Sequence, residues 1–364
     1  MTSPEVQPGP PGPVRWGVFG AGAMAAKFAG DVGSAAGASL AAVASRDPAK
    51  AAALAQAHGG RGAASYEALA RDDHVDAIYV ATPNALHLDH ALMAIRAGKP
   101  VLVEKPFALD AAEARLIADA AREAGVFCME AMWARFLPAV AAAKRAVEAG
   151  RIGAPTYLRA EIGFPAPTDP KSRFNDPALG GGALLDLGVY GVSMARWMLG
   201  PVEDAAATLT QGATGADRIA SVQLRHGGAA ASILASHAGE LGNSLEVVGT
   251  EGRVVVEPPF PQSMRARIFA FPPPPESAPG PQGPEGRAKR ALKKAGLYPT
   301  VRRLGRRLTG RDGEAIKGDF VGEGYQFQME EVGRRLAAGE TESPVMPLDE
   351  TIEVMETLDR LRAG

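Results

Sequence analysis

The fold is decided by the stretch Val14-Arg15-Trp16-Gly17-Val18-Phe19-Gly20-Ala21-Gly22-Ala23-Met24-Ala25. Its apolar first half is typical of a buried strand, and the pattern G-x-G-x-x-A that follows is typical of a tight turn between a strand and a helix. Glycine lets the backbone approach a pyrophosphate there, and the start of the helix offers unpaired N–H groups and the positive end of its dipole. We therefore predict that this turn binds a dinucleotide through Gly20, Gly22, Ala23 and Met24.

The same alternation of strand and helix continues beyond the turn. Short apolar runs at residues 14–19, 39–44, 77–81, 101–104 and 126–130 alternate with alanine-rich amphipathic stretches at 48–58, 85–97 and 111–124. Strands that alternate with helices of this length indicate βαβ units and a parallel sheet. We expect residues 14–137 to form a doubly wound Rossmann domain of the α/β class.

The pattern changes after residue 137. Helices are expected at 139–149, 182–199, 323–338 and 348–361, and the strands between them have turn signals at 226–228 and 249–252. Short strands joined by tight turns indicate an antiparallel sheet. Residues 138–364 are therefore predicted to form an α+β domain with a large, mainly antiparallel sheet that serves substrate binding and oligomerisation.

Two segments fall outside this scheme. Residues 1–13 are rich in proline and glycine and lack the apolar core of a secretion signal, so we expect a disordered leader. Residues 272–319 begin as a Pro/Gly-rich linker and continue into 287–311, where lysine and arginine dominate. We expect an insertion whose charges face water, in preference to a contact with nucleic acid, a membrane or phosphate.

Composition narrows the classes of function. The 364 residues are 46% hydrophobic and 22% charged, as in a folded globular chain. A net charge of -2 gives no overall attraction to nucleic acid or to an acidic membrane, and no apolar run reaches the roughly 20 residues of a membrane span. Cys128 is the only cysteine and the six histidines are scattered, so the sequence predicts no disulfide, no metal site and a cytoplasmic location.

The choice of dinucleotide is indicated at the end of the second strand. An NAD site usually has a carboxylate there for the ribose 2′-hydroxyl, whereas this chain has Ser45 and Arg46, with Lys50 one turn later. A hydroxyl beside a guanidinium suits a 2′-phosphate, which favours NADP over NAD. The alternative is that Arg46 only stacks on adenine, which would permit both cofactors.

Polar residues that follow the strand at 77–81 are expected to line the nicotinamide end of the cleft. These residues are Thr82, Pro83, Asn84 and His87. His87 is an alternative acid or base for the reaction, although it more simply starts the next helix.

Charged residues at two further places indicate chemistry. Glu104 and Lys105 end the strand at 101–104, at the carboxyl edge where open α/β sheets bind ligands, and Pro106 is expected to turn the chain sharply, through a cis bond. Asp186 and Tyr190 lie four residues apart and so share one face of the helix at 182–199. Both pairs also have ordinary interpretations, an ion bridge for the first and a tyrosine packed in the core for the second.

The glycine turn, Glu104-Lys105-Pro106 and the Asp-x-x-x-Tyr helix together resemble the Gfo/Idh/MocA oxidoreductases over residues 14–271 and 324–364. The sequences at 129–138 and 342–348 resemble those of one branch of that family, which contains dimeric dihydrodiol dehydrogenase and NADP-dependent D-xylose dehydrogenase. The resemblance implies a homodimer, a catalytic group of Lys105, Asp186 and Tyr190, and a substrate bordered by Trp133, Arg135 and Phe136. Ile162 stands where that branch is expected to have an aromatic ring, which leaves the substrate open.

A mechanism follows from these expectations. Hydride transfer leaves a proton to be handled on the reacting oxygen, and Tyr190 is the expected acid or base. Lys105 is expected to lower the tyrosine pKa from about 10 toward a useful range, while Asp186 orients Lys105 or the substrate. Asn175 and Asp176 are expected to offer hydrogen bonds to the substrate.

The predicted reaction is NADP-dependent oxidation or reduction of a CH–OH carbon on a sugar, such as xylose or glucose, or on a trans-dihydrodiol. A cyclitol or a keto-sugar is the alternative substrate. A regulator that senses the dinucleotide without catalysis is the alternative of another class, and the set of Lys105, Asp186 and Tyr190 argues against it.

Overall fold

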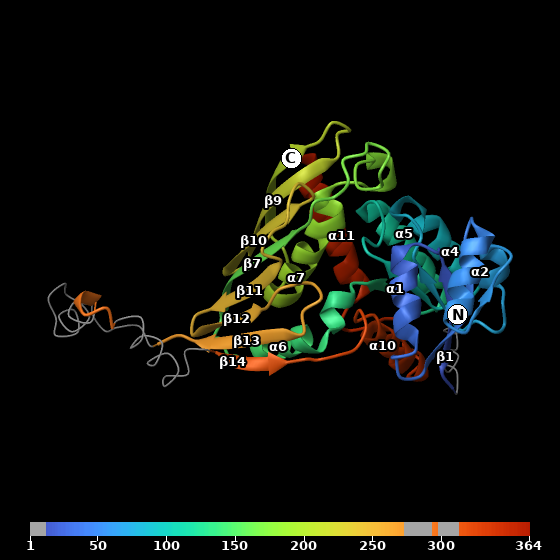
Figure 1. The fold of residues 1–364 in the computed structure, drawn as a ribbon, viewed down its shortest axis with the longest axis horizontal. Coiled ribbons are helices and arrows are strands. Elements are labelled where there is room, and N and C mark those ends of the chain that lie inside the picture. The colour runs from blue at the N-terminus through green and yellow to red at the C-terminus, as the bar shows by residue number, and fades with distance from the viewer. Residues whose placement is uncertain (1–11, 273–292, 298–312) are drawn as a thin grey trace.

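The computed structural model describes residues 12–272, 293–297 and 313–364. Two domains lie side by side, and each is built on one sheet (Figure 1). The prediction of a parallel Rossmann sheet followed by a mainly antiparallel sheet is confirmed.

The first sheet has six parallel strands in the order β3-β2-β1-β4-β5-β6. These strands are β1 (Val14–Phe19), β2 (Ala38–Ala44), β3 (Arg61–Gly62), β4 (Ala77–Val80), β5 (Val101–Glu104) and β6 (Cys128–Ala131). The helices between them are α1 (Ala23–Val32), α2 (Pro48–Ala57), α3 (Tyr66–Ala70), α4 (His87–Arg96) and α5 (Ala111–Ala124). The strand order reverses between β1 and β4, and at such a switch point the carboxyl ends of the strands open a crevice.

Strand β1 holds the glycine turn in place because helices pack tightly on both of its faces. A Cβ added to Gly17 would lie 2.4 Å from Leu69 Cδ2, so a larger residue would push α3 away. On the opposite face Trp16 packs edge-on against Phe28 of α1, and Phe28 stacks on Tyr79 of β4. These buried contacts give the crevice a rigid base.

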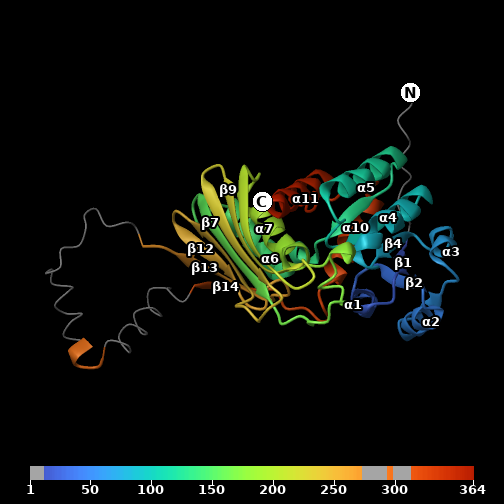
Figure 2. The ribbon, with the colours of Figure 1, turned by 90° about the horizontal axis from the view of Figure 1, so that it is seen from above.

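The second sheet has eight strands in the order β14-β13-β12-β11-β7-β10-β9-β8, antiparallel except for the pair β7–β10. They are β7 (Pro155–Gly163), β8 (Asp204–Gln211), β9 (Asp217–His226), β10 (Ala229–Ser236), β11 (Ser244–Gly249), β12 (Gly252–Val256), β13 (Arg265–Ala270) and β14 (Glu314–Lys317). Helices α6 (Pro138–Glu148) and α7 (Val189–Leu199) pack on one face (Figure 2). The expected turns at 226–228 and 249–252 join β9 to β10 and β11 to β12.

One apolar helical stretch in the described part of the chain, Pro177–Leu199, is long enough to cross a membrane. Within the protein, 83% of its apolar window is buried. The stretch is therefore a helix of the core.

The expected insertion at 272–319 contains one strand that was not predicted. Its last residues form β14, which pairs with β13 and extends the second sheet. Most of the basic run at 287–311 lies outside the described residues, as does the leader apart from residues 12 and 13. β14 was missed because Glu314–Lys317 is mostly exposed and gives no alternating apolar pattern.

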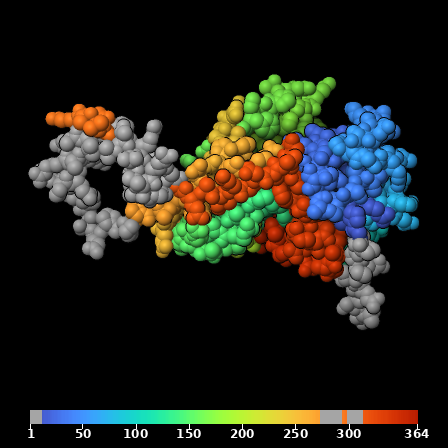
Figure 3. Space-filling view, turned by 60° about the horizontal axis from the view of Figure 1, so that its bottom comes forward, coloured from blue at the N-terminus to red at the C-terminus, as the bar shows by residue number. Residues whose placement is uncertain are grey.

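The C-terminal helices pack against the first domain, although the sequence analysis assigned all residues after 137 to the second domain. Helix α10 (Gln326–Ala337) packs on α1 and β2, and α11 (Leu348–Ala363) packs on α5 and α7. In Figure 3 the orange-to-red end of the chain lies against both the green α6 region and the blue first domain. The buried Asp31 carboxylate of α1 accepts N–H bonds from Glu323 and Tyr325, so this return is anchored by hydrogen bonds as well as by packing.

Candidate active site

A cleft opens at the carboxyl ends of β1, β2, β4 and β5, where the strand order predicts one. Every residue that the sequence analysis assigned to the cofactor lines it: Gly20, Gly22, Ala23, Met24, Ser45, Arg46, Lys50, Thr82, Pro83, Asn84, His87, Glu104 and Lys105. Asp186 and Arg173 of the second domain also line it, and so do Ala21, Asp47, Tyr66 and Ala81, which were not predicted as cofactor residues. The cleft therefore lies between the two domains.

The glycine turn has the geometry that a pyrophosphate needs. Gly20 has a φ of 110°, and an added Cβ would lie 2.6 Å from the Ala81 carbonyl oxygen. Gly22 caps α1 without a side-chain hydrogen bond, and a Cβ there would meet nothing within 4 Å. The N-terminus of α1 therefore has both unpaired backbone donors and open space beside them, as phosphate binding requires.

The end of β2 offers a guanidinium and a hydroxyl to the same cleft. Arg46 is exposed and has no hydrogen bond to any residue that the structure describes. The carboxylate of Asp47 is already used, because its Oδ1 atom caps α2 by accepting the N–H groups of Ala49 and Lys50. This corner therefore suits a phosphate better than a bare ribose hydroxyl.

His87 is a structural residue of the cleft wall. Its ring is fully buried at the start of α4, and its two nitrogens lie 2.9 Å from the Pro106 carbonyl oxygen and 3.0 Å from that of Thr82. Burial lowers the pKa of His87 to about 4, although both carbonyl contacts oppose this shift. The neutral ring has one N–H and donates it to one of these two carbonyl oxygens, and its position between them connects the end of β4 with the turn after β5, where the bond from Lys105 to Pro106 is cis.

Lys105 reaches across the domain boundary to Asp186. Its Nζ atom donates to the Asp186 backbone oxygen at 2.7 Å and to Oδ1 at 3.1 Å, and both side chains are about nine-tenths buried. Burial disfavours the ammonium, but Asp186 and Tyr190 outweigh it and raise the pKa of Lys105. Burial likewise disfavours the Asp186 carboxylate, but Lys105 and His237 hold its pKa below the usual range. The pair is therefore ionised at neutral pH.

The helix that carries Asp186 and Tyr190 is not a regular α-helix. Residues Leu184–Gly188 form a π-helical turn that leads into α7. The Lys105 Nζ atom contacts Asp186 and also lies 4.7 Å from the centroid of the Tyr190 ring. The expected convergence of these three residues is thus present, around a π-helical turn of the kind often found at functional sites.

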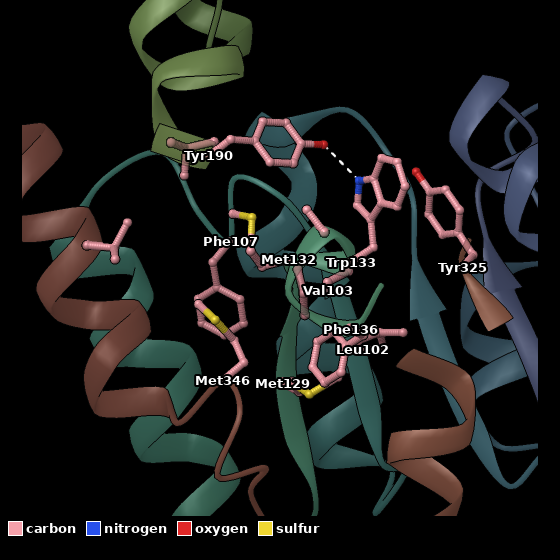
Figure 4. Close-up of a cluster of buried hydrophobic side chains, with 14 of the residues drawn as sticks. Leu102, Val103, Phe107, Met129, Met132, Trp133, Phe136, Tyr190, Tyr325 and Met346 are labelled. Atoms are coloured by element: carbon pink, nitrogen blue, oxygen red, sulfur yellow. Dashed lines mark hydrogen bonds between the residues drawn. The ribbon is translucent and has the colours of Figure 1, made fainter. Parts of the chain in front are cut away.

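Tyr190 is held by an indole. Trp133 Nε1 donates to the Tyr190 hydroxyl at 2.8 Å, and the Trp133 ring stacks on Tyr325, with 5.2 Å between ring centroids (Figure 4). Burial raises the pKa of Tyr190 to about 12, even though Lys105 and the indole N–H lower it. The expectation that Lys105 brings the tyrosine pKa below 10 is wrong for this state, because desolvation is the larger effect.

His237 completes the group, although no sequence pattern predicted it. It follows β10, is fully buried, and its Nε2 atom lies 3.1 Å from Asp186 Oδ2. Arg173 lies on the other side of the carboxylate, with Nη1 3.6 Å from Oδ1. Neither residue sits in a sequence motif, because both reach Asp186 only through the folding of the second domain.

Several residues expected at the substrate do not reach the cleft. Arg135 is fully buried, and its guanidinium pairs with Glu350 and with the side chain and backbone of Ser193. Phe136 lies beside Leu102 and Met129 in a buried cluster (Figure 4). Within the stretch 129–138, Arg135 and Phe136 are therefore buried structural residues, whereas Trp133 contacts Tyr190.

The loop residues Asn175 and Asp176 also have structural roles. The Asn175 amide donates to the carbonyl oxygens of Pro167 and Asp169 and accepts from Arg218, so no donor of this side chain is left for a ligand. Asp176 caps a short helical turn by accepting the N–H of Ala178. Both residues shape the loop beside the cleft.

Comparison with known proteins agrees with this geometry. The model of the Gfo/Idh/MocA oxidoreductases, with an NAD-binding Rossmann fold, matches residues 14–132, and the model of that family's C-terminal domain matches residues 140–255. A trans-1,2-dihydrobenzene-1,2-diol dehydrogenase from Mus musculus is 32% identical over 358 residues, which are 96% of each chain. A D-xylose 1-dehydrogenase (NADP(+)) from Hypocrea jecorina is 30% identical over 82% of this chain and 75% of its own.

The fold is shared with solved structures. A 3-ketoreductase from Actinomadura kijaniata, in complex with NADP and TDP-benzene, has a TM-score of 0.75 at 22% identity, over 97% of this chain and 98% of its own. The two family models cover the first sheet and the strands β7 to β12 of the second, and the murine relative matches nearly the whole length. The chain therefore belongs to the Gfo/Idh/MocA family of NAD(P)-binding oxidoreductases.

Proposed function

We propose that this protein transfers a hydride between NADP(H) and a CH–OH carbon of a sugar, such as xylose or glucose, or of a trans-dihydrodiol. The observation that carries the proposal is the meeting of Lys105, Asp186 and Tyr190: Lys105 and Asp186 line the dinucleotide cleft, and the buried Tyr190 ring contacts Lys105. Its relatives at 30% identity or more include enzymes named for a dihydrodiol and for D-xylose, which supports this substrate class.

The residues of the cleft fit NADP. The open N-terminus of α1 beside Gly22 would hold the pyrophosphate, and Ser45 and Arg46 would hold the 2′-phosphate, whereas NAD would leave Arg46 without an anion. When bound, the nicotinamide gives or takes the hydride. The residues of this chain then have one remaining task, which is to handle the proton of the reacting oxygen.

Tyr190 is the residue suited to that task. An indole N–H can only donate, so the bond from Trp133 fixes the tyrosine oxygen without using the tyrosine's own proton. That proton is available to a substrate oxygen. The Lys105 ammonium, 4.7 Å from the ring centroid, stabilises the phenolate left behind, and Asp186 keeps the ammonium charged and in position.

The raised pKa of Tyr190 favours a second candidate, the reduction of a keto-sugar. At a pKa of about 12 the hydroxyl is protonated throughout the neutral range and can act as an acid. Oxidation of an alcohol needs the same group as a base. At pH values below the pKa, the phenolate fraction rises about tenfold for each unit by which the pH is raised. Tyr190 is therefore in the protonation state that reduction needs at neutral pH, whereas oxidation should speed up as the pH is raised.

We further propose that the enzyme works as a cytoplasmic homodimer. The face of the second sheet opposite α6 and α7 is broad and lies away from the cleft, so it offers a contact surface that leaves the site accessible. Sedimentation at micromolar concentration checks this, with a mass of about twice 37.7 kDa expected.

The function is tested by absorbance at the NADPH wavelength across a panel of D-xylose, D-glucose, trans-1,2-dihydrobenzene-1,2-diol, myo-inositol and a 3-keto-sugar. NADP and NAD are compared in the oxidation direction, and NADPH and NADH with the keto-sugar. We expect turnover with at least one sugar or diol and a preference for the phosphorylated cofactor. Binding of NADPH with no turnover on any member would contradict the proposal and point to a sensor.

A further inference from the structure

Arg173 lies at the substrate end of the cleft without a partner that satisfies its donors. It lines the cleft with Lys105 and Asp186, and its side chain is 48% exposed. Its nearest carboxylate oxygen, Asp186 Oδ1, is 3.6 Å away and already accepts from Lys105. Among the described residues nothing forms a hydrogen bond with the Arg173 guanidinium, which has five N–H donors.

This guanidinium is held in a fixed position. It lies over the Phe174 ring, 4.0 Å from the centroid, and Phe174 packs edge-on against Phe164 and His237. Stacking of this kind leaves the edge of the guanidinium, which carries the donors, free for a ligand.

The loop below Arg173 is equally well fixed. The Arg218 guanidinium donates to the carbonyl oxygens of Ala166 and His237 and to the Asn175 side chain, so it braces both ends of the loop. Asn175 adds two bonds to carbonyl groups before it in the loop. An arginine on a braced loop loses little conformational entropy when it binds, which distinguishes Arg173 from a surface arginine on a loose segment.

Two arginines of the cleft have, among the described residues, no carboxylate that pairs with them alone. Lys105 is paired with Asp186, and Lys50 lies 3.8 Å from Asp47 Oδ2. Arg46 at one end and Arg173 at the other have no anion of their own, since Asp186 is shared with Lys105 and His237. Arg46 matches the 2′-phosphate of NADP, and the N-terminus of α1 beside Gly22 matches the pyrophosphate, so Arg173 is available to an anion on the other ligand, the substrate.

We propose that Arg173 forms an anion subsite and that the substrate is an acidic sugar, whose carboxylate or phosphate pairs with this guanidinium. The inference rests on the proposed sugar dehydrogenase function and specifies its substrate. A carboxylate and a phosphate both match the planar fork of donors, so the shared chemistry is a small oxyanion on a polyhydroxy chain.

The test compares D-glucose, D-glucuronate and D-glucose 6-phosphate with wild type, Arg173→Gln, Arg173→Lys and the control Arg151→Gln. Arg151 is 47% exposed and pairs with Glu314 outside the cleft, which matches Arg173 in exposure. We expect kcat/KM for one acidic sugar to exceed that for D-glucose by about 10- to 100-fold, the value of a charged hydrogen-bonded contact. Arg173→Gln should remove most of this preference, Arg173→Lys should keep part of it, and Arg151→Gln should keep all of it.

Two further readouts separate the subsite from other roles. The Kd of NADPH, measured by fluorescence, should be the same in Arg173→Gln and wild type, and the acidic preference should shrink as salt is raised. A loss of NADPH affinity, or equal losses on neutral and acidic sugars, would overturn the anion subsite while leaving the dehydrogenase function intact. Absence of turnover on all three sugars and on the wider panel would instead count against the proposed function itself.

Discussion

Replacing Lys105 by methionine removes the ammonium at the centre of the site and keeps a side chain of similar length. The Nζ atom lies 4.7 Å from the Tyr190 ring centroid. Two unit charges about 5 Å apart interact by about 3 kcal/mol at an effective dielectric constant of about 20, which corresponds to about two pKa units. Because burial already raises the pKa of Tyr190 to about 12, the variant should hold its tyrosine proton more tightly still.

The expected result is a loss of about 100-fold in the rate of alcohol oxidation at pH 8, measured as NADPH formation at saturating substrate. The wild-type oxidation rate should rise with pH, because deprotonation of Tyr190 limits it, and the curve of Lys105→Met should lie at higher pH. Lys105→Arg keeps the charge and should lose less.

Stability has to be followed in the same variants. Breaking a buried pair leaves the Asp186 carboxylate without its main counter-charge and costs about 3–5 kcal/mol, so melting curves and NADPH binding must show that the variant is folded. If folded Lys105→Met oxidised its substrate within fivefold of wild type, the assigned role of the ammonium would be refuted.

Three more predictions follow from named contacts. Arg46→Ala should raise the Km for NADP about 10- to 100-fold and leave NAD nearly unchanged, and equal losses would contradict the phosphate contact. Burial raises the pKa of Glu130 from 4.5 to about 7, so between these pH values the folded state keeps a proton that the unfolded state releases. The free energy of unfolding of the wild type should therefore fall by up to about 3 kcal/mol as the pH rises from 4.5 to 7. In Glu130→Gln this pH dependence, measured by urea titration, should be smaller. His237→Phe should lower kcat about tenfold with unchanged NADPH affinity, because Asp186 loses the donor at Oδ2; an unchanged kcat would remove His237 from the site.

Most of the fold could be predicted because its strands are apolar runs bounded by turn residues. β1 (Val14–Phe19) and β5 (Val101–Glu104) have the predicted bounds, since both are buried on two sides. The short strand β3 and the exposed strand β14 could not be found, because pairing with a neighbour defines them and their own composition does not. The C-terminal helices were predicted as helices, but their return to the first domain depends on tertiary contacts.

The candidate site divides in the same way. Residues near the glycine turn and the ends of β2, β4 and β5 line one cleft as predicted, because strand topology alone brings them together. His237 and Arg173 could not be predicted, since each meets Asp186 only when the second domain folds. Arg135 was expected at the substrate because the stretch 129–138 resembles that of a related branch, but the direction of its side chain depends on its ion-pair partner Glu350, far away in sequence.

The most direct measurement is the single-turnover rate of Tyr190→Phe with bound cofactor, alongside the Kd of NADPH. We expect the chemical step to slow by about 10²- to 10⁴-fold, the usual contribution of a positioned acid or base, while the Kd stays within twofold, because Tyr190 does not line the cofactor cleft. A phenylalanine variant that reacts at the wild-type rate would show that the proton travels through another group.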